Sequence, residues 1–121
     1  MNTYIDTHIT LRRLLGICYS NEISITIIRT CGSWPGEESF DIYEGSGSTT
    51  NSIFHQGRCS AITTNLCISP VVHTIVMRDS ARDGWSSGSR VTIRHQDQSY
   101  TYTGPSGSSR SETFQFVDIF I

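Results

Sequence analysis

The sequence predicts an all-β fold, an antiparallel β-sandwich of the jelly-roll type stapled by disulfides. Three observations support this prediction. Eight short stretches rich in β-branched or aromatic residues follow one another, with turn residues between them. No stretch has the apolar period of an amphipathic helix, Lys is absent, and Ser and Thr make up 32 of the 121 residues. The four cysteines form an even set, and the length suits a single domain, residues 1–121.

The first strands are expected close to the start of the chain. Residues 4–11 alternate apolar and polar side chains, which is typical of a half-buried strand. Residues 14–17 are an apolar patch that suits a short turn or a further strand. Residues 22–30 are the strongest strand signal of the first half, because β-branched residues dominate them.

Two shorter strands are expected next. Residues 39–44 place Phe40 and Ile42 on one face, and Ser52–Gln56 forms a short strand after a Gly/Ser/Thr loop. We expect residues 58–67 to be a connector.

The second half of the chain contains the remaining four strands. Residues 71–78 are β-branched and apolar, and residues 90–94 alternate polar and apolar side chains. Residues 98–103 alternate Tyr with Ser and Thr before a Gly-Pro-Ser-Gly turn, and residues 111–121 form the last strand.

The loop after residue 78 carries unusual turn chemistry. Asp79 and Asp83 suit tight turns because Asp accepts hydrogen bonds from backbone N–H groups just ahead of it, and Gly84 permits a positive φ. Trp85 is too large to leave in water, so we expect it to fold over one end of the core. These four residues are therefore predicted to be structural.

The stretch Asp-Ser-Ala-Arg-Asp-Gly-Trp at residues 79–85 resembles the Asp-Ser-x-Gly-Asp-Gly-Trp motif of small β-rich modules in secreted and cell-surface proteins of microbial eukaryotes. Thr-Cys-Gly-Ser at 30–33, Glu-Glu-Ser-Phe at 37–40 and Cys-Ile-Ser at 67–69 fit the same pattern, so the resemblance covers residues 22–93. Arg82 stands where the family usually has Gly. The resemblance implies a β-rich fold and an extracellular location rather than an activity.

Residues 18–58 and 67–109 show signs of an internal repeat. Cys, Arg and Trp recur at spacings of 49 or 51 residues, in the pairs Cys18 and Cys67, Arg29 and Arg78, and Trp34 and Trp85. Chance similarity between two β-hairpins is the alternative.

The cysteines suggest two disulfides formed in an oxidising compartment. An extended strand at 22–30 would span ~30 Å, too far for Cys18 to reach Cys31. Two pairings remain: Cys18–Cys59 with Cys31–Cys67, which we favour, or Cys18–Cys67 with Cys31–Cys59. The favoured pairing assumes that strand 22–30 lies antiparallel to the strand that follows Cys67.

A calcium site at Asp79 and Asp83 is one candidate for chemistry. The spacing matches two ligand positions of a calcium loop, but Ala81 and Arg90 occupy other ligand positions and exclude an EF-hand. The alternative is that both carboxylates cap backbone N–H groups. Residues 84–88 read Gly-x-Ser-x-Gly, which is the pattern of the nucleophile elbow of α/β-hydrolases. That elbow is followed by a helix, whereas a strand is expected here. We therefore expect no enzyme, and no cofactor other than calcium.

Composition limits the partners. The net charge is −2, without a basic face for nucleic acid, and no apolar run is long enough to cross a membrane. No Asn-x-Ser/Thr site is present, so a glycoprotein would carry its sugars on Ser or Thr. Aromatic residues could form a platform for sugars or pack in the core: Trp34, Trp85, Tyr100 and Tyr102.

The last expected strand is apolar on both faces. Phe114, Phe116 and Phe120 lie on one face, and Val117, Ile119 and Ile121 on the other. An uncovered strand of this kind can pair with a strand of another chain, so we expect the protein to self-assemble, and repeated pairing would build a filament. The alternative is a monomer whose terminal strands pair with each other. The sequence therefore predicts an extracellular structural or adhesive building block, with a lectin-like, calcium-assisted carbohydrate-binding module as the alternative.

Overall fold

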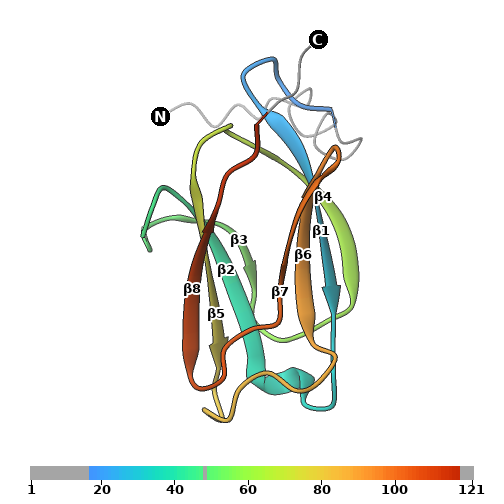
Figure 1. The fold of residues 1–121 in the computed structure, drawn as a ribbon, viewed down its shortest axis with the longest axis vertical. Coiled ribbons are helices and arrows are strands. Elements are labelled where there is room, and N and C mark those ends of the chain that lie inside the picture. Colours follow the sequence, from blue (N-terminus) through green and yellow to red (C-terminus); the bar gives the residue numbers. More distant parts are fainter. Residues whose placement is uncertain (1–16, 48, 118–121) are drawn as a thin grey trace, which may run out of the picture.

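The computed structural model describes residues 17–47 and 49–117, which form two four-stranded antiparallel sheets packed face to face (Figure 1). One sheet has the strand order β4-β1-β6-β7 and the other has β3-β2-β5-β8. The predicted β-sandwich is confirmed. Its strands are β1 (Ile23–Thr30), β2 (Glu38–Glu44), β3 (Ser52–Gln56), β4 (Ile62–Ile68), β5 (His73–Asp79), β6 (Arg90–His95), β7 (Gln98–Tyr102) and β8 (Ser109–Phe114).

The prediction was wrong for residues 58–67, which are not a connector throughout but include most of β4. The apolar positions of this strand are Ile62, Leu66, Cys67 and Ile68, and the Thr and Asn residues at 63–65 interrupt the alternation. The last strand is also shorter than expected, because β8 ends at Phe114 and residues 115–117 are not in a strand. The strand expected at residues 4–11, the patch at 14–16 and residues 118–121 lie outside the described residues.

The core lies between the two sheets and follows from strand alternation. Inward-facing Ile25 and Ile27 of β1 meet Ile42 of β2 and Ile75 of β5, and all four are completely buried. Because successive side chains on a strand point to opposite faces, these residues and the aromatic side chains beside them fill the space between the sheets.

Both disulfides form, but the favoured pairing was wrong. Cys18 bonds to Cys67 and Cys31 bonds to Cys59. The reason is the missed strand: β1 pairs antiparallel with β4, so that its start lies beside the end of β4 and its end lies beside the start of β4. Each disulfide therefore ties one end of β1 to the nearest end of β4. Peptide mapping without reduction is expected to recover these two linked pairs; a Cys18–Cys59 peptide would contradict the β1–β4 register.

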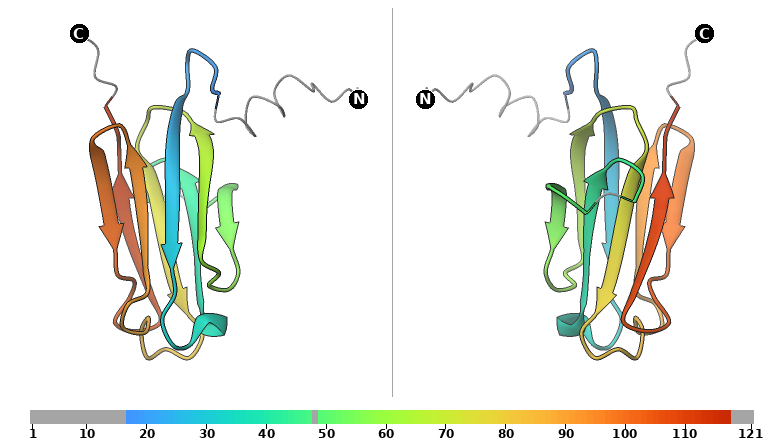
Figure 2. Two further views of the ribbon diagram at one scale, coloured as in Figure 1. Left: turned by 90° about the vertical axis from the view of Figure 1, so that its right-hand side faces the viewer. Right: turned by 90° about the vertical axis from the view of Figure 1, so that its left-hand side faces the viewer.

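The loops gather at the two ends of the sandwich (Figure 2). The β1–β2, β5–β6 and β7–β8 loops lie at one end, here called the loop end, together with the 3-10 turn η1 (Pro35–Glu37). The β4–β5 loop and the first and last described residues lie at the opposite end. No helix within the described part of the chain is long and apolar enough to cross a membrane.

Candidate functional site

Trp85 covers the core at the loop end, as the sequence predicts. Its side chain is 8% exposed, and its indole nitrogen donates a hydrogen bond to the carbonyl of Arg78 at 2.9 Å. The backbone of Gly104 presses against the ring with φ at 83°, and a Cβ there would collide with the indole. Gly84, with φ at 87°, turns the chain so that the Trp85 N–H donates to the carbonyl of Pro105.

A buried ion pair lies under Trp85, and sequence reasoning missed it. Arg29 and Glu38 are each 1% exposed, with 3.5 Å between Nη2 and Oε1, and the guanidinium carbon lies 3.9 Å from the centre of the Trp85 ring. Burial lowers the pKa of Arg29 to about 10, although the charge and hydrogen bond of Glu38 act in the opposite direction. The guanidinium is therefore a cation at neutral pH. The sequence contains a signal for the burial of Arg29, because this residue continues the alternation of the inward-facing isoleucines at 23, 25 and 27.

Glu38 also fixes the loop that carries Trp85. Its Oε2 accepts hydrogen bonds from the backbone N–H and the hydroxyl of Ser86, both at 2.8 Å. The Ser86 hydroxyl lies 3.2 Å from that of Ser89, which in turn accepts the Gly32 N–H. Ser86 is the central residue of the Gly-x-Ser-x-Gly pattern. Its hydroxyl is hydrogen-bonded to a carboxylate and to a second hydroxyl, and it lies in a loop between two strands rather than before a helix.

Asp79 is architectural. It is buried at the end of β5, and its two carboxylate oxygens accept the N–H groups of Ala81 at 3.2 Å and Asp83 at 3.0 Å. Asp83 itself is exposed. The prediction that Asp residues hold the loop N–H groups is therefore met by Asp79, a consequence of turn chemistry that is local in sequence.

Arg82 occupies a left-handed conformation, with φ at 64°. This is the position where the resembling family usually has Gly. Because a Cβ is unfavourable at positive φ, Arg82→Gly is expected to raise the free energy of unfolding by about 0.5–1 kcal/mol. Denaturant unfolding measures this change. The control is Ala81→Gly, whose φ is not positive and which should lower stability by about 0.5–1 kcal/mol; equal effects of the two substitutions would contradict the loop conformation.

Three carboxylates, one of them buried, meet at the loop end. Ligand oxygens of Glu37, Asp79 and Asp83 all lie within 4.8 Å of one another. Glu37 was missed as a member because it precedes the loop by some forty residues; a hydrogen bond from the Ser80 N–H to its carbonyl brings it there. The cluster has the oxygen ligands that Ca²⁺ takes, with Glu37 beside the two predicted ligands. Calcium binding stays a prediction.

Two carboxyls of this cluster, those of Glu37 and Asp83, have raised pKa values. Lost hydration and the negative charges of Asp83, Asp79 and Glu38 raise the pKa of Glu37 above its ordinary value of 4.5. A hydrogen bond to Asp79, lost hydration and the charge of Asp79 raise the pKa of Asp83. A raised carboxyl pKa means that the folded protein holds the proton more tightly than the unfolded chain, so ionisation of these groups opposes folding.

Glu37→Gln is therefore expected to raise the melting temperature at pH 7, because it removes one charge from the cluster. Below the pKa that Glu37 has in the unfolded chain, its carboxyl is protonated in both states, and the wild type then resembles the Gln variant. As the pH rises through the higher pKa of the folded state, the wild type loses this stability. The difference in melting temperature between the variant and the wild type should therefore shrink below about pH 4. Thermal unfolding at several pH values measures it. Asp97→Asn, an exposed carboxylate in the β6–β7 turn, is the control, and a Glu37→Gln difference that does not change with pH would contradict the expectation.

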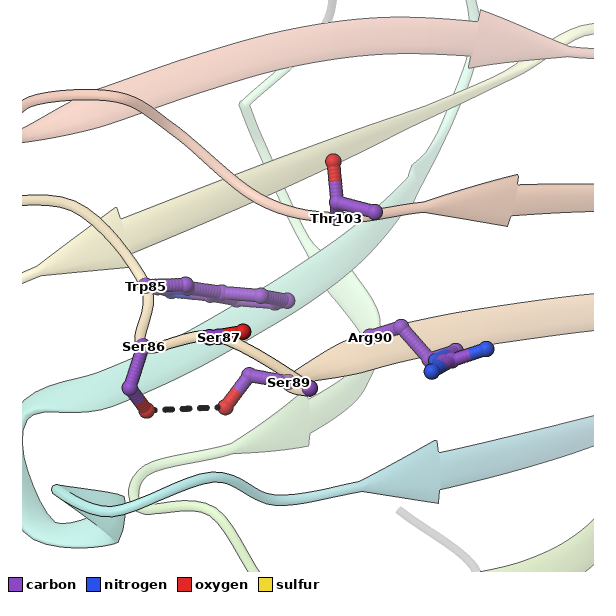
Figure 3. A pocket seen from close by; sticks show the side chains of 7 residues that line it. Trp85, Ser86, Ser87, Ser89, Arg90 and Thr103 are labelled. Atoms are coloured by element: carbon purple, nitrogen blue, oxygen red, sulfur yellow. Dashed lines mark hydrogen bonds between the residues drawn. The ribbon is translucent and has the colours of Figure 1, made fainter.

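A shallow pocket of about 350 Å³ lies beside Trp85 (Figure 3). The figure shows the indole ring between Thr103 on one side and the hydrogen-bonded Ser86 and Ser89 on the other. Arg90 adds a cation at the rim, and the complete lining is Trp85, Ser86, Ser87, Gly88, Ser89, Arg90 and Thr103. Such a surface offers hydroxyl donors and acceptors and one guanidinium.

The four aromatic residues considered for a sugar platform are not brought together. Trp34 is 65% exposed in the β1–β2 loop, whereas Trp85 is buried against Arg29. Tyr100 and Tyr102 stack on each other along β7, with 6.4 Å between ring centres. The two tryptophans thus have different environments, and the internal repeat stays a prediction.

The residues predicted for self-assembly divide into three groups. Phe114 and Phe116 are each 2% exposed and pack against Tyr100, so this chain's own core covers them. Val117 is exposed. Residues 119–121 lie outside the described residues.

No protein-family model matches the chain. No similar curated protein and no similar solved structure was found. The fold and the loop end are therefore the basis for an inference about function.

Proposed function

We propose that this protein is an extracellular structural or adhesive module that contacts its partner with the loop end of the sandwich. The observation that carries the proposal is Trp34, a large aromatic side chain held in water. Hot spots of protein interfaces are enriched in Trp, which combines a large apolar area with few rotatable bonds. A single exposed apolar residue is common on proteins, but an exposed Trp on a braced loop is suited to binding.

The surroundings of Trp34 support this role because a disulfide and hydrogen bonds brace them. The Cys31–Cys59 disulfide anchors the loop, and the Cys59 N–H donates a hydrogen bond to the carbonyl of Pro35. The Glu37 N–H donates to the carbonyl of Trp34 itself. A side chain presented by an ordered loop loses little conformational entropy on binding. Two disulfides also suit an oxidising, extracellular location.

Adhesion of protein-coated beads tests the proposal on two surfaces, a glycan array and beads that carry the same protein. Trp34→Ala should reduce adhesion at least tenfold, the size of effect typical of an interface hot spot, without changing the melting temperature. Val71→Ala is the control, since Val71 is exposed and belongs to the β4–β5 loop at the opposite end. Adhesion to neither surface, or adhesion that Trp34→Ala leaves intact, would refute the proposal.

A lectin-like module is the second candidate, and the pocket beside Trp85 favours it. Its hydroxyl groups suit a polyhydroxylated ligand, Arg90 suits an acidic sugar, and the carboxylates near Glu37 suit a calcium-assisted contact. A glycan array with and without chelator separates the candidates. Binding that Arg90→Ala abolishes and Trp34→Ala spares would favour the lectin, and glycan binding insensitive to both variants would exclude it at this pocket.

Self-assembly through the chain ends is a separate proposal, because the first and last described residues lie opposite the loop end. Because Phe114 and Phe116 belong to the core, deletion of residues 114–121 would damage the fold and could not test assembly. Removal of residues 118–121 together with Val117→Ser is the sharper variant. Sedimentation at increasing concentration should show oligomers of the full chain that this variant lacks; a full-length monomer at high concentration would end the proposal of a filament.

A further inference from the structure

The two described sheets have four edge strands, and three of these have features that oppose pairing with another chain. The edges are β4 and β7 of one sheet and β3 and β8 of the other. An unpaired strand edge presents N–H and C=O groups to solvent, and proteins usually protect it with a short strand, a bulge, charged residues or a covering segment. An edge strand that lacks all of these features is suited to bind a further strand.

The edges β3, β7 and β8 are each protected. β3 has only five residues, and its register with β2 shifts, as at a bulge. Beside β7, the Gln98 side chain hydrogen-bonds both the N–H and the carbonyl of Val117, so that residues 115–117 lie along this edge. β8 carries the ion pair of Arg110 and Glu112, with 2.7 Å between Nε and Oε2.

β4 has none of these protections. It has seven residues, without a charged residue or a proline, and its pairing with β1 has no register shift. Most of its residues are β-branched, which favours an extended strand: Ile62, Thr63, Thr64 and Ile68. Within the described residues, no other strand and no loop backbone bonds to the side of β4 that faces away from β1. Alternate residues of β4 therefore offer N–H and C=O groups along this side.

The side chains along β4 suit contact with a second protein. Thr63 and Asn65 are exposed, and the Asn65 side chain is held by a hydrogen bond from the Thr26 hydroxyl at 2.9 Å. Leu66 is only partly buried, and it lines a pocket of about 290 Å³ together with the exposed Ile53 of β3. The free edge of β4 therefore has both ordered polar and apolar side chains next to it.

The charges near the two ends of β4 select the partner. Glu22 precedes β1, and one of its carboxylate oxygens lies within 4.8 Å of the Cys67 sulfur, so a negative charge is located at the end of β4. Arg58 is exposed in the loop that leads into β4, so a positive charge precedes the start of the strand. When two copies of β4 pair antiparallel, the end of each strand lies beside the start of the other, and the opposite charges approach each other. The edge is thus complementary to itself.

We infer that β4 binds β4 of a second copy, in a symmetric dimer in which two four-stranded sheets join into one continuous sheet. A two-fold axis that pairs all seven residues passes beside Asn65, the central residue of the strand, so Asn65 faces Asn65 of the second copy. The inference goes beyond the proposed adhesive function and does not rest on Trp34. It is also distinct from assembly through the chain ends.

Cross-linking tests this pairing. Asn65→Cys should give a dimer linked through the two introduced cysteines, because directly opposite residues of antiparallel strands have Cα atoms about 4.5–5.5 Å apart, within the range of a disulfide. Thr101→Cys is the matched control, since Thr101 is exposed on β7, the other edge strand of the same sheet, and should give no linked dimer. Gel electrophoresis without reductant measures both.

Sedimentation at increasing concentration measures the strength of the dimer. The wild type should show an equilibrium between monomer and dimer, and Asn65→Lys should weaken the dimer about tenfold or more, because two ammonium groups then lie directly opposite each other. Thr101→Lys adds the same charge to the other edge and should leave the dimer unchanged. Circular dichroism checks that both variants fold; if Asn65→Lys does not, the cross-link at residue 65 still decides.

Three results would overturn the inference: a wild type that stays monomeric at high concentration, a dimer that Asn65→Lys leaves intact, or a dimer that Asn65→Lys weakens and Asn65→Cys does not link. In the last case another segment occupies the edge. Trp34→Ala should leave the dimer intact, which separates it from the adhesive function. If adhesion to beads carrying the same protein persists in Trp34→Ala and is lost when Asn65→Lys is added, the dimer is supported and the role of Trp34 is refuted; a monomeric protein whose adhesion needs Trp34 would show the reverse.

Discussion

Trp85→Ala is expected to lower the free energy of unfolding by about 3–5 kcal/mol, as large-to-small substitutions of buried aromatic residues do. The ring fills the loop end of the core, so its removal leaves a cavity under the β5–β6 loop. It also removes the aromatic face against which the Arg29 guanidinium lies, and the carbonyl of Arg78 loses its indole donor. Chemical denaturation followed by fluorescence of the remaining Trp34, or by circular dichroism, measures the change.

Trp34→Ala is the matched control for this substitution. Both variants lose one indole at the loop end, but the Trp34 side chain is mainly in water, so we expect a change within about 0.5 kcal/mol. The close approach of Gly104 adds a second test. Gly104→Ala should be strongly destabilising in the wild type and less so when Trp85 is already alanine, because the added Cβ collides with the indole. An unchanged melting temperature of Trp85→Ala would mean that the loop does not close the core.

Glu38→Gln is expected to lower the free energy of unfolding by about 3–5 kcal/mol, although the two side chains have nearly the same size and shape. The reason is Arg29, which keeps its proton at neutral pH because its pKa is about 10. Without Glu38 the guanidinium remains buried with only neutral acceptors, the Gln56 side chain and two backbone carbonyls. Urea unfolding at pH 7 measures the loss.

Glu112→Gln is the control for a carboxylate whose ion pair is exposed. Its bond to Arg110 is short, at 2.7 Å, but both partners are in contact with water, and such pairs contribute about 0–1 kcal/mol. Arg29→Met added to Glu38→Gln should recover part of the stability, since it removes the charge that lacks a partner. If Glu38→Gln lowers the free energy of unfolding as little as Glu112→Gln does, the Glu38 carboxylate does not stabilise the buried Arg29 cation.

The sequence was most informative where the determining interactions are local. Strand β1 follows from the alternation of isoleucines, and the role of Asp79 follows from the reach of a carboxylate to N–H groups two and four residues ahead. Strand β4 was missed because Thr and Asn conceal its alternation, and that omission led directly to the wrong disulfide pairing.

The sequence alone therefore determined the all-β class, the presence of two disulfides and the burial of Trp85, since each depends on residue type and short-range periodicity. The tertiary structure decided which side chains meet: Arg29 with Glu38 and Trp85, and Glu37 with Asp79 and Asp83. These residues lie on different strands and loops, and the packing of the two sheets against each other brings them together. Register of this kind depends on long-range packing, which a local pattern does not encode.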